Sequence, residues 1–246
     1  MITSTKLTVK TFGCFSIKRQ VGENTLIISE SDNVSRKLWG LIQYLIIFRK
    51  RGVSRGELID AFWGDDFSGS PDNSLKALIF RARRALTALD FPDGKEIIRA
   101  EGNGYRLNNT ICFDIDSEKF EAYSNRAQTE KSPAKKLENA KMALRLYDGD
   151  FLSSSSEYAW AATLNVYYHS KYLKLCKSTV SALADKNNFE EIISLCKRAL
   201  IIEPYDEMLH CALIEAFTET GAMQAAMRHY TYIIDLFISE LAISPS

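Results

Sequence analysis

The sequence predicts a mainly α-helical chain with a small β component, in which a mixed part over residues 1–109 precedes an all-α part over residues 110–246. The length of 246 residues favours two domains of ordinary size over one small core. Hydrophobic residues make up 46% and charged residues 25% of the chain, which is typical of packed globular proteins and excludes a disordered or collagen-like chain. Strand signals occur only in the first part, whereas helical periodicity dominates the second.

The two parts differ in charge although the whole chain is neutral. Lys plus Arg and Asp plus Glu each total 31. Residues 1–109 carry 17 basic and 12 acidic side chains, a net charge of +5, whereas residues 110–246 carry 14 basic and 19 acidic ones, a net charge of −5. This asymmetry predicts a basic module that binds an anionic partner, joined to an acidic module that contacts proteins.

Cysteine usage and the N-terminal sequence predict a cytoplasmic protein. The cysteines form no C-x-x-C pair and lack the density of a disulfide-stabilised domain, so we expect buried apolar thiols in a reducing compartment. They are Cys14, Cys112, Cys176, Cys196 and Cys211. Residues 1–10 lack the apolar core of a signal peptide, and no apolar run approaches the roughly 20 residues that span a membrane. We therefore expect no membrane partner.

The first part is expected to open with a small sheet followed by a helix. Residues 7–17 are rich in β-branched and aromatic residues, with Gly13 as an expected bulge, and residues 25–29 resemble a second short strand. Residues 35–48 then repeat apolar side chains at helical spacing, with Ser35 as N-cap. The many apolar residues predict that this helix is mostly buried.

Two further helices are expected after this one. Ser54 and Glu57 form a capping box, in which the hydroxyl and the carboxylate satisfy N–H groups at the start of a short helix. Residues 64–70 are a predicted loop, and Pro71 suits the first position of a third helix that continues to about residue 89.

The third helix is strongly two-sided. At helical spacing its apolar residues gather on one side, which must face the core: Leu75, Leu78, Ile79, Ala82, Ala85 and Leu86. The opposite side carries Lys76, Ala77, Phe80, Arg81 and Arg84, with Arg83 at its edge. Cations with an exposed phenylalanine suit a helix in the DNA major groove, where Arg and Lys reach guanine edges or phosphates and an apolar group meets thymine methyls. A solvated basic face is the alternative.

A glycine-tipped hairpin completes the first part. Two short β segments flank Gly102, Asn103 and Gly104. Because Asn and Gly readily adopt the positive φ that a tight turn needs, this pattern predicts a hairpin. A capped short helix, a loop, a helix with a basic outer side and a hairpin follow one another in the order of a winged helix-turn-helix domain. Its hairpin would place Arg99, Asn103 and Arg106 at an adjacent minor groove or backbone.

Beyond Phe113 the chain is expected to be helical nearly throughout. Predicted helices cover residues 117–129, 133–146, 157–184, 189–202, 206–220 and 222–241. A period of 34 residues places Phe189, Ile192, Cys196, Ala199 and Leu200 opposite Met223, Ala226, Tyr230, Ile233 and Ile234. Pro204 closes one unit, so tetratricopeptide-like repeats are predicted. A stack of such repeats leaves a groove that suits protein contact or self-association.

Ordered runs of residues in both parts are similar to one protein family. RKLWGLIQYLIIFRKRGVSRGELIDAFWGDD, PDNSLKALIFRARRAL and IIRAEGNGYRL resemble the OmpR-type winged helix of the Streptomyces antibiotic regulatory proteins. FDIDSEKFEAY, LYDGDFL and the repeat that ends at Pro204 resemble the bacterial transcriptional activator domain that follows it in that family. The resemblance covers nearly the whole chain, to an end at Ser246 where relatives commonly continue with another helix.

The resemblance implies a transcriptional activator that binds promoter DNA, often at direct repeats, and recruits RNA polymerase. Carried over by position, the recognition-helix sites are Lys76, Phe80, Arg81, Arg83 and Arg84, and Asn103 lies at the wing tip. Residues 64–70 match a candidate polymerase contact. Phe80 stands where relatives usually carry a small polar residue, so base preference does not transfer. A homodimer, or two copies side by side on direct repeats, would gain effective concentration.

No catalytic, metal or cofactor site is expected. The histidines His169, His210 and His229 are isolated in sequence and lack the paired spacing of metal ligands. The serines at residues 153–156 lack the glycine-flanked elbow of a hydrolase nucleophile and predict a loop. The competing function is a protein-interaction scaffold built on the helical repeats, which would capture a partner without preferring any DNA sequence.

Overall fold

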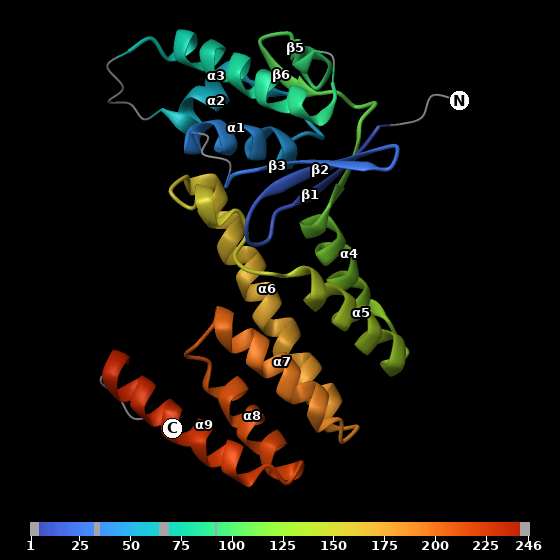
Figure 1. Ribbon diagram of the computed structural model, residues 1–246, viewed down its shortest axis with the longest axis vertical. Helices are drawn as coiled ribbons and strands as arrows, with labels where there is room; N and C mark the ends of the chain where they lie inside the picture. The colour runs from blue at the N-terminus through green and yellow to red at the C-terminus, as the bar shows by residue number, and fades with distance from the viewer. Residues whose placement is uncertain (1–4, 32–34, 64–68, 92, 242–246) are drawn as a thin grey trace. The chain divides into compact units, whose positions relative to one another are not determined.

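The computed structural model describes residues 5–31, 35–63, 69–91 and 93–241 of the chain (Figure 1). The backbone divides into two compact units. The first consists of Met1–Lys119 and Leu146–Tyr168, and the second of Phe120–Arg145 and His169–Ser246. The fold is mainly helical, and all its described strands lie in the first unit. This confirms the predicted fold class.

Four strands form the larger sheet of the first unit, in the order β3-β2-β1-β7. They are β1 (Lys6–Lys10), β2 (Ser16–Val21), β3 (Asn24–Ser29) and β7 (Cys112–Ile115). The first three form an antiparallel meander, and β7 pairs with β1 in parallel. Leu7, Val9 and Ile17 are almost completely buried, so one face of the sheet belongs to the core.

The prediction of a single bulged strand over residues 7–17 was wrong. Gly13 lies in the connection between β1 and β2 with φ 72°, and the chain reverses there. A Cβ at Gly13 would stand 2.8 Å from the carbonyl oxygen of Asp148. Glycine therefore permits both the positive φ and the close approach, and the segment becomes two antiparallel strands.

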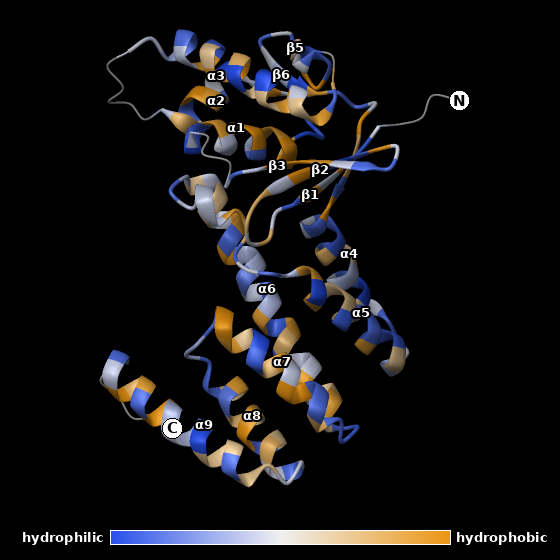
Figure 2. Ribbon diagram, in the orientation of Figure 1, coloured by the Kyte–Doolittle hydropathy of each residue, from blue (hydrophilic) through white to orange (hydrophobic). Residues whose placement is uncertain are grey.

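Three helices follow the sheet in the first unit. They are α1 (Arg36–Ile47), α2 (Arg55–Phe62) and α3 (Pro71–Leu86). In Figure 1, α1 lies between the four-stranded sheet and the pair formed by α2 and α3. Nearly all of α1 is buried, as predicted, and Figure 2 shows its apolar character beside the mixed character of α3.

The start of α2 carries the predicted serine cap. The Ser54 hydroxyl accepts a hydrogen bond from the Glu57 N–H at 3.1 Å. The Glu57 carboxylate accepts from the Tyr44 hydroxyl at 2.7 Å and from Arg51 Nη1 at 2.8 Å. The hydrogen bond from Arg51 lowers the pKa of Glu57, and burial together with the bond to Glu57 raises the pKa of Tyr44 to about 12. These contacts fix α2 to α1.

The predicted hairpin is present and gains a third strand. β5 (Ile98–Glu101) and β6 (Gly104–Leu107) are antiparallel, and β4 (Val53–Ser54) pairs with β6. The sheet order is β4-β6-β5. Two residues are too few to show an alternating pattern, so β4 left no signal in the sequence.

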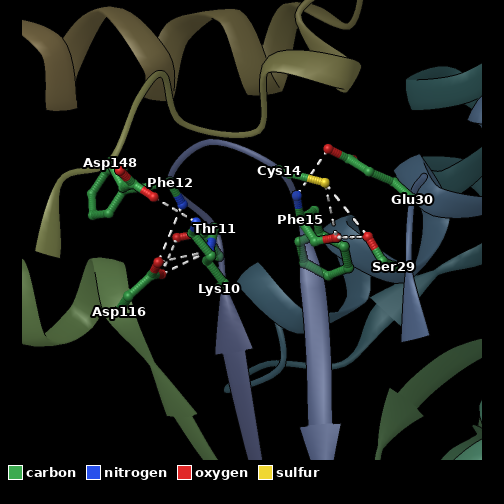
Figure 3. A network of polar contacts seen from close by, with 9 residues as sticks. All are labelled: Lys10, Thr11, Phe12, Cys14, Phe15, Ser29, Glu30, Asp116 and Asp148. Atoms are coloured by element: carbon green, nitrogen blue, oxygen red, sulfur yellow. Dashed lines mark hydrogen bonds and ion pairs between the residues drawn. The ribbon is translucent and has the colours of Figure 1, made fainter. Parts of the chain in front are cut away.

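A network of polar contacts ties the connection between β1 and β2 to the start of the helical part of the chain (Figure 3). The Asp116 carboxylate accepts from the backbone N–H groups of Thr11 at 2.8 Å and Phe12 at 3.2 Å. Burial raises the pKa of Asp116, against the opposing effect of these hydrogen bonds. Glu30, on the other side of the connection, accepts from the Phe15 N–H at 2.8 Å.

The serine run forms a 3₁₀ turn, η3 (Ser153–Ser155), where a loop was predicted. The Ser155 hydroxyl donates to Gln43 Oε1 at 2.5 Å in a fully buried contact. The Gln43 amide donates in turn to Glu30 at 3.1 Å. These serines therefore satisfy buried polar groups of the first unit, which is a structural role.

All six predicted helices of the second part are present. They are α4 (Asp116–Thr129), α5 (Pro133–Leu146), α6 (Ala159–Ala184), α7 (Phe189–Ile202), α8 (Glu207–Glu219) and α9 (Met223–Leu236), which η4 (Phe237–Leu241) extends as a π-helix. Asn188 and Asp206 cap α7 and α8 with their side chains, which explains why these helices begin where the sequence predicts.

The repeat of 34 residues is reflected in burial at two of its paired positions. Ile192 and its counterpart Ala226 are both buried, as are Ala199 and Ile233. A third pair breaks the pattern, because Cys196 is buried whereas Tyr230 is 58% exposed. Among the described residues, α9 packs on α8 and its Tyr230 side stays uncovered.

The expectation of buried thiols holds for two cysteines only. Cys176 and Cys196 are buried, and burial raises the pKa of each thiol to about 12. Cys14, Cys112 and Cys211 are exposed, so the prediction was wrong for them. The apolar preference of a thiol does not decide which face of a strand or helix a position occupies. Over the described ranges, no helix combines the length and apolarity needed to cross a membrane.

Candidate nucleic-acid interface

Helix α3 presents two chemically different sides. Its core side is formed by the buried residues Leu75, Leu78, Ile79, Ala82 and Leu86, with Ala85 half-buried. Its other side, here called the α3 outer face, consists of the exposed residues Lys76, Ala77, Phe80, Arg81 and Arg84. Burial of the apolar side fixes the rotation of the helix, so the basic side must point to solvent.

The cations of the α3 outer face are free of partners in the described part of the chain. The side chains of Lys76, Arg81 and Arg84 make no hydrogen bond or ion pair with any described residue. Phe80 lies among them and is 67% exposed. Unpaired guanidinium groups can bind phosphates or guanine edges without breaking an internal ion pair, and an exposed ring can contact a thymine methyl.

Arg83 differs from its neighbours because its side chain already has a partner. Its Nε and Nη2 both donate to the backbone carbonyl of Ile98, at 3.0 and 2.8 Å. Ile98 is the first residue of β5. The guanidinium of Arg83 therefore joins α3 to the hairpin.

Two close backbone approaches fix the hairpin beside α3. A Cβ on Gly94, in the turn η2 (Gly94–Glu96), would stand 2.2 Å from the carbonyl oxygen of Arg83. A Cβ on Gly104 would stand 2.1 Å from the carbonyl oxygen of Val53. Only glycine fits at either position. The hairpin is thus held against both α3 and the start of α2.

The tip of the hairpin confirms only part of the predicted turn chemistry. Gly102 has φ 55°, whereas Asn103 is not among the residues with positive φ, so only the glycine supplies that conformation. The Asn103 carbonyl accepts from the N–H of Arg55 at 3.0 Å. The residue itself is exposed, so its amide is accessible at the tip.

The two predicted hairpin arginines lie opposite each other in register. Arg99 is exposed, and Arg106 is half-buried. The Arg106 guanidinium lies 3.3 Å from a carboxylate oxygen of Glu101. Arg99 is therefore the more available cation of the pair.

A further cation, Lys95, lies beside α3 and is not predicted from the sequence. Lys95 is exposed and directly follows Gly94, whose backbone touches that of Arg83. Its signal was weak, because an isolated lysine in a turn is unremarkable until the turn is placed against the helix. It lies between the exposed residues Asp93 and Glu96 in the turn that packs against the C-terminal end of α3.

The histidines are not all isolated in space. His210 Nδ1 lies 3.0 Å from His229 Nε2, and His210 Nε2 lies 2.8 Å from the carbonyl oxygen of Pro204. The sequence separation of these residues concealed the pair. The described residues contain no group of three or more His, Cys, Asp or Glu side chains that could hold a metal ion.

Comparison with known proteins places both parts of the chain. Residues 30–107 match the C-terminal family of transcriptional regulatory proteins, and residues 115–246 match the bacterial transcriptional activator domain. The regulatory protein AfsR of Streptomyces griseus is 24% identical over 212 residues, which cover 83% of this chain and 20% of AfsR. The transcriptional regulator RedD of Streptomyces coelicolor is 24% identical over 214 residues, which cover 85% of this chain and 60% of RedD.

One solved structure shares the fold of nearly the whole chain. Mycobacterium tuberculosis EmbR, solved in complex with a low-affinity phosphopeptide, matches with a TM-score of 0.64 at 18% identity. The match covers 98% of this chain and 62% of EmbR. The chain therefore spans less than two thirds of each of these three proteins.

The fold and the two matches define a chain in which a C-terminal domain of the transcriptional regulatory protein type is followed by a helical bacterial transcriptional activator domain. The match over residues 115–246 covers more than half of the sequence. The chain belongs to the bacterial transcriptional activator domain family, in the domain order of the Streptomyces antibiotic regulatory proteins. The resemblance found in the sequence is thereby confirmed.

Proposed function

We propose that this chain is a sequence-specific transcriptional activator that binds promoter double-stranded DNA with residues 1–109 and contacts proteins with residues 110–246. In this proposal, α3 lies in the major groove. The DNA-contacting residues are Lys76, Ala77, Phe80, Arg81, Arg83 and Arg84 on α3, and Arg99, Asn103 and Arg106 on the hairpin. The hairpin lies along the adjacent minor groove or backbone.

The observation that carries the proposal is the unpaired basic side of α3. Arg81 and Arg84 are exposed, and neither makes an ion pair within the described part of the chain. Two such guanidinium groups on consecutive turns of a helix of 16 residues, beside an exposed phenylalanine, suit an external polyanion with apolar groups in its groove.

From their internal contacts, we expect the nine residues to contribute unequally to DNA affinity. Arg81 and Arg84 are expected to contribute most, since no internal contact competes for them. Arg83 and Arg106 already bind Ile98 and Glu101, so we expect them to position the hairpin and to reach DNA secondarily. Single substitutions at these positions should therefore lower DNA affinity by different amounts, which a binding titration can measure.

RNA polymerase is the protein partner that we propose, together with a second copy of the chain on direct repeats. The candidate polymerase contact at residues 64–70 lies mostly outside the described residues. The exposed apolar side chains of α9, among them Met223, Met227 and Tyr230, favour protein contact by the second part. The same side chains would serve the scaffold function, so DNA binding decides between the two.

Selection of bound fragments from a random double-stranded DNA pool, followed by gel-shift titration of the selected sequence, tests the proposal. Arg81→Ala and Arg84→Ala should each weaken binding by about 1–3 kcal/mol, with relaxed base preference for a base contact and uniform loss for a phosphate contact. Arg126→Ala is the matched control, because Arg126 is exposed on α4. Enrichment of no sequence, with variants that bind like the unaltered chain, would support the scaffold instead.

A further inference from the structure

The second unit contains a cavity that DNA binding does not use. Helices α4, α5 and α6 enclose it, with a volume of about 420 Å³. Its walls include the buried residues Ala127, Leu137, Ala140 and Leu175. Facing helices usually fill such a space with large side chains, but here alanine and serine are frequent among the lining residues. The volume falls within the range of small-molecule sites.

Two buried hydroxyl groups in this α4–α6 cavity lack partners. Ser124 on α4 and Thr179 on α6 line it and are 1% and 2% exposed. Neither hydroxyl has a hydrogen-bond partner in the described part of the chain. Elsewhere in the protein, helical threonines satisfy themselves by donating to the carbonyl four residues earlier, as Thr163 and Thr218 do. A buried hydroxyl without a partner is unfavourable, and a ligand acceptor would relieve it.

The charge of the cavity lining is positive although the surrounding part of the chain is acidic. Lys136 on α5 and Lys174 on α6 line the cavity, are exposed, and make no ion pair with any described residue. A third lining lysine, Lys171, lies 3.0 Å from the Asn125 side-chain oxygen and pairs with Glu121. Asp185 is the one acidic residue among the described lining residues.

We infer that the α4–α6 cavity binds a small amphipathic carboxylate, which inserts an apolar body between the helices and directs its carboxylate to Lys136, Lys174 and the unpartnered hydroxyls. An apolar floor favours the hydrocarbon body through burial. Ammonium and hydroxyl donors favour an anion over a neutral or cationic analogue of the same shape. The inference does not depend on the DNA-binding proposal.

Isothermal titration of the full chain with naphthalene-2-carboxylate and decanoate tests the inference, with 2-naphthamide and 2-naphthylmethylamine as neutral and cationic analogues. We expect saturable binding of one carboxylate per chain for at least one of the two acids. The amide and the amine should bind at least about tenfold more weakly, because charge-assisted hydrogen bonds are lost. Absence of saturable binding by both acids would overturn the inference, and so would equal binding of the acid and the amide.

Three variants locate the binding. The double variant Lys136→Gln with Lys174→Gln should weaken the bound carboxylate about tenfold while leaving the amide unchanged. Ser178→Trp should abolish binding by filling the mouth of the cavity, since Ser178 lines it and is exposed; Ala182→Phe serves the same purpose should the first variant fail to fold. Lys135→Gln is the matched control, because Lys135 is exposed on α5 but does not line the cavity. Unchanged affinity in a folded cavity-filling variant would place the ligand elsewhere and refute the inference.

Discussion

Arg83 and Arg84 are neighbours in sequence with the same chemistry, but the structure gives them different roles. Arg83 donates two hydrogen bonds to Ile98, whereas Arg84 is exposed and has no side-chain partner in the described part of the chain. A helical wheel places Arg83 at the edge of the basic side, and only the position of β5 shows what that edge meets. The residue types therefore predict a basic surface. Tertiary contacts show which of its cations hold the hairpin in place and which are available to bind a partner.

Arg83→Ala should lower the free energy of unfolding of the first unit by about 1–2 kcal/mol, because hydrogen bonds from a charged donor are lost and a carbonyl is left unpaired. Arg84→Ala should change that free energy by less than about 0.5 kcal/mol, as exposed substitutions do. Urea titration followed by tryptophan fluorescence measures this difference, since Trp39, Trp63 and Trp160 all belong to the first unit. Equal stability of the two variants, with a selective loss of DNA affinity in Arg83→Ala, would instead make DNA contact the main role of Arg83.

At the scale of elements, the histidine pair joins α8 to α9. The carbonyl of Pro204 can only accept, so His210 donates to it through Nε2 and uses Nδ1 to accept from His229 Nε2. This arrangement requires a lone pair on His210 Nδ1, whereas His229 can donate through Nε2 whether its ring is neutral or protonated. Burial, followed by the proximity of His210 and Lys197, lowers the pKa of His229 below its ordinary value of 6.5.

The pKa shift of His229 predicts that the packing of α8 on α9 weakens in mild acid. The unfolded chain binds the proton at about pH 6.5 while the folded chain still excludes it, so the free energy of unfolding is full above that pH and falls below it until the lowered pKa is passed. Amide hydrogen exchange in α8 and α9, compared at about pH 7.5 and pH 5.5 after correction for intrinsic rates, should show lost protection at the lower pH.

Two variants identify the group responsible. His229→Gln should remove the acid sensitivity of these amides, because no titrating ring remains at that position. His169→Gln is the control and should preserve the sensitivity, since His169 contacts Glu203 at 3.0 Å and is not part of the pair. Identical pH dependence in both variants would exclude His229 as its source.

The sequence predicts helices better than strands in this chain, for a physical reason. Helices α4 to α9 carry long apolar periodicity and side-chain caps at Asn188 and Asp206, which are local signals. The two-residue strand β4 and the parallel pairing of β1 with β7 depend on residues far apart in the chain, so no local pattern contains them. The same limit hid the partner of Arg83, the His210–His229 pair and the placement of Lys95 beside α3.

At the scale of the whole molecule, a net charge of zero would predict no electrostatic attraction of a polyanion. Screening at physiological salt confines the effect of exposed charges to about 8 Å, so under the proposed function the local basic surface of α3 and the hairpin, and not the net charge of the chain, should determine the attraction of DNA. In the proposed function, the acidic residues of the second part should not oppose this attraction strongly, because screening weakens their effect. Binding should therefore depend on salt as for a basic domain.

We expect DNA affinity to fall linearly with salt on logarithmic axes. If Lys76, Arg81, Arg84 and Arg99 each neutralise one phosphate, the slope should be about −3.5. The double variant Arg81→Ala with Arg84→Ala should reduce the steepness by about 2, because about one unit is lost per phosphate contact. Lys131→Ala with Lys135→Ala removes two exposed cations of the second part and should leave the slope unchanged.

Fluorescence anisotropy between about 50 and 200 mM salt measures these slopes over the range in which counterion release dominates. A flat titration would show that no phosphates are neutralised and would favour the scaffold function. A steep slope that both double variants reduce equally would show that the DNA contact is not confined to α3.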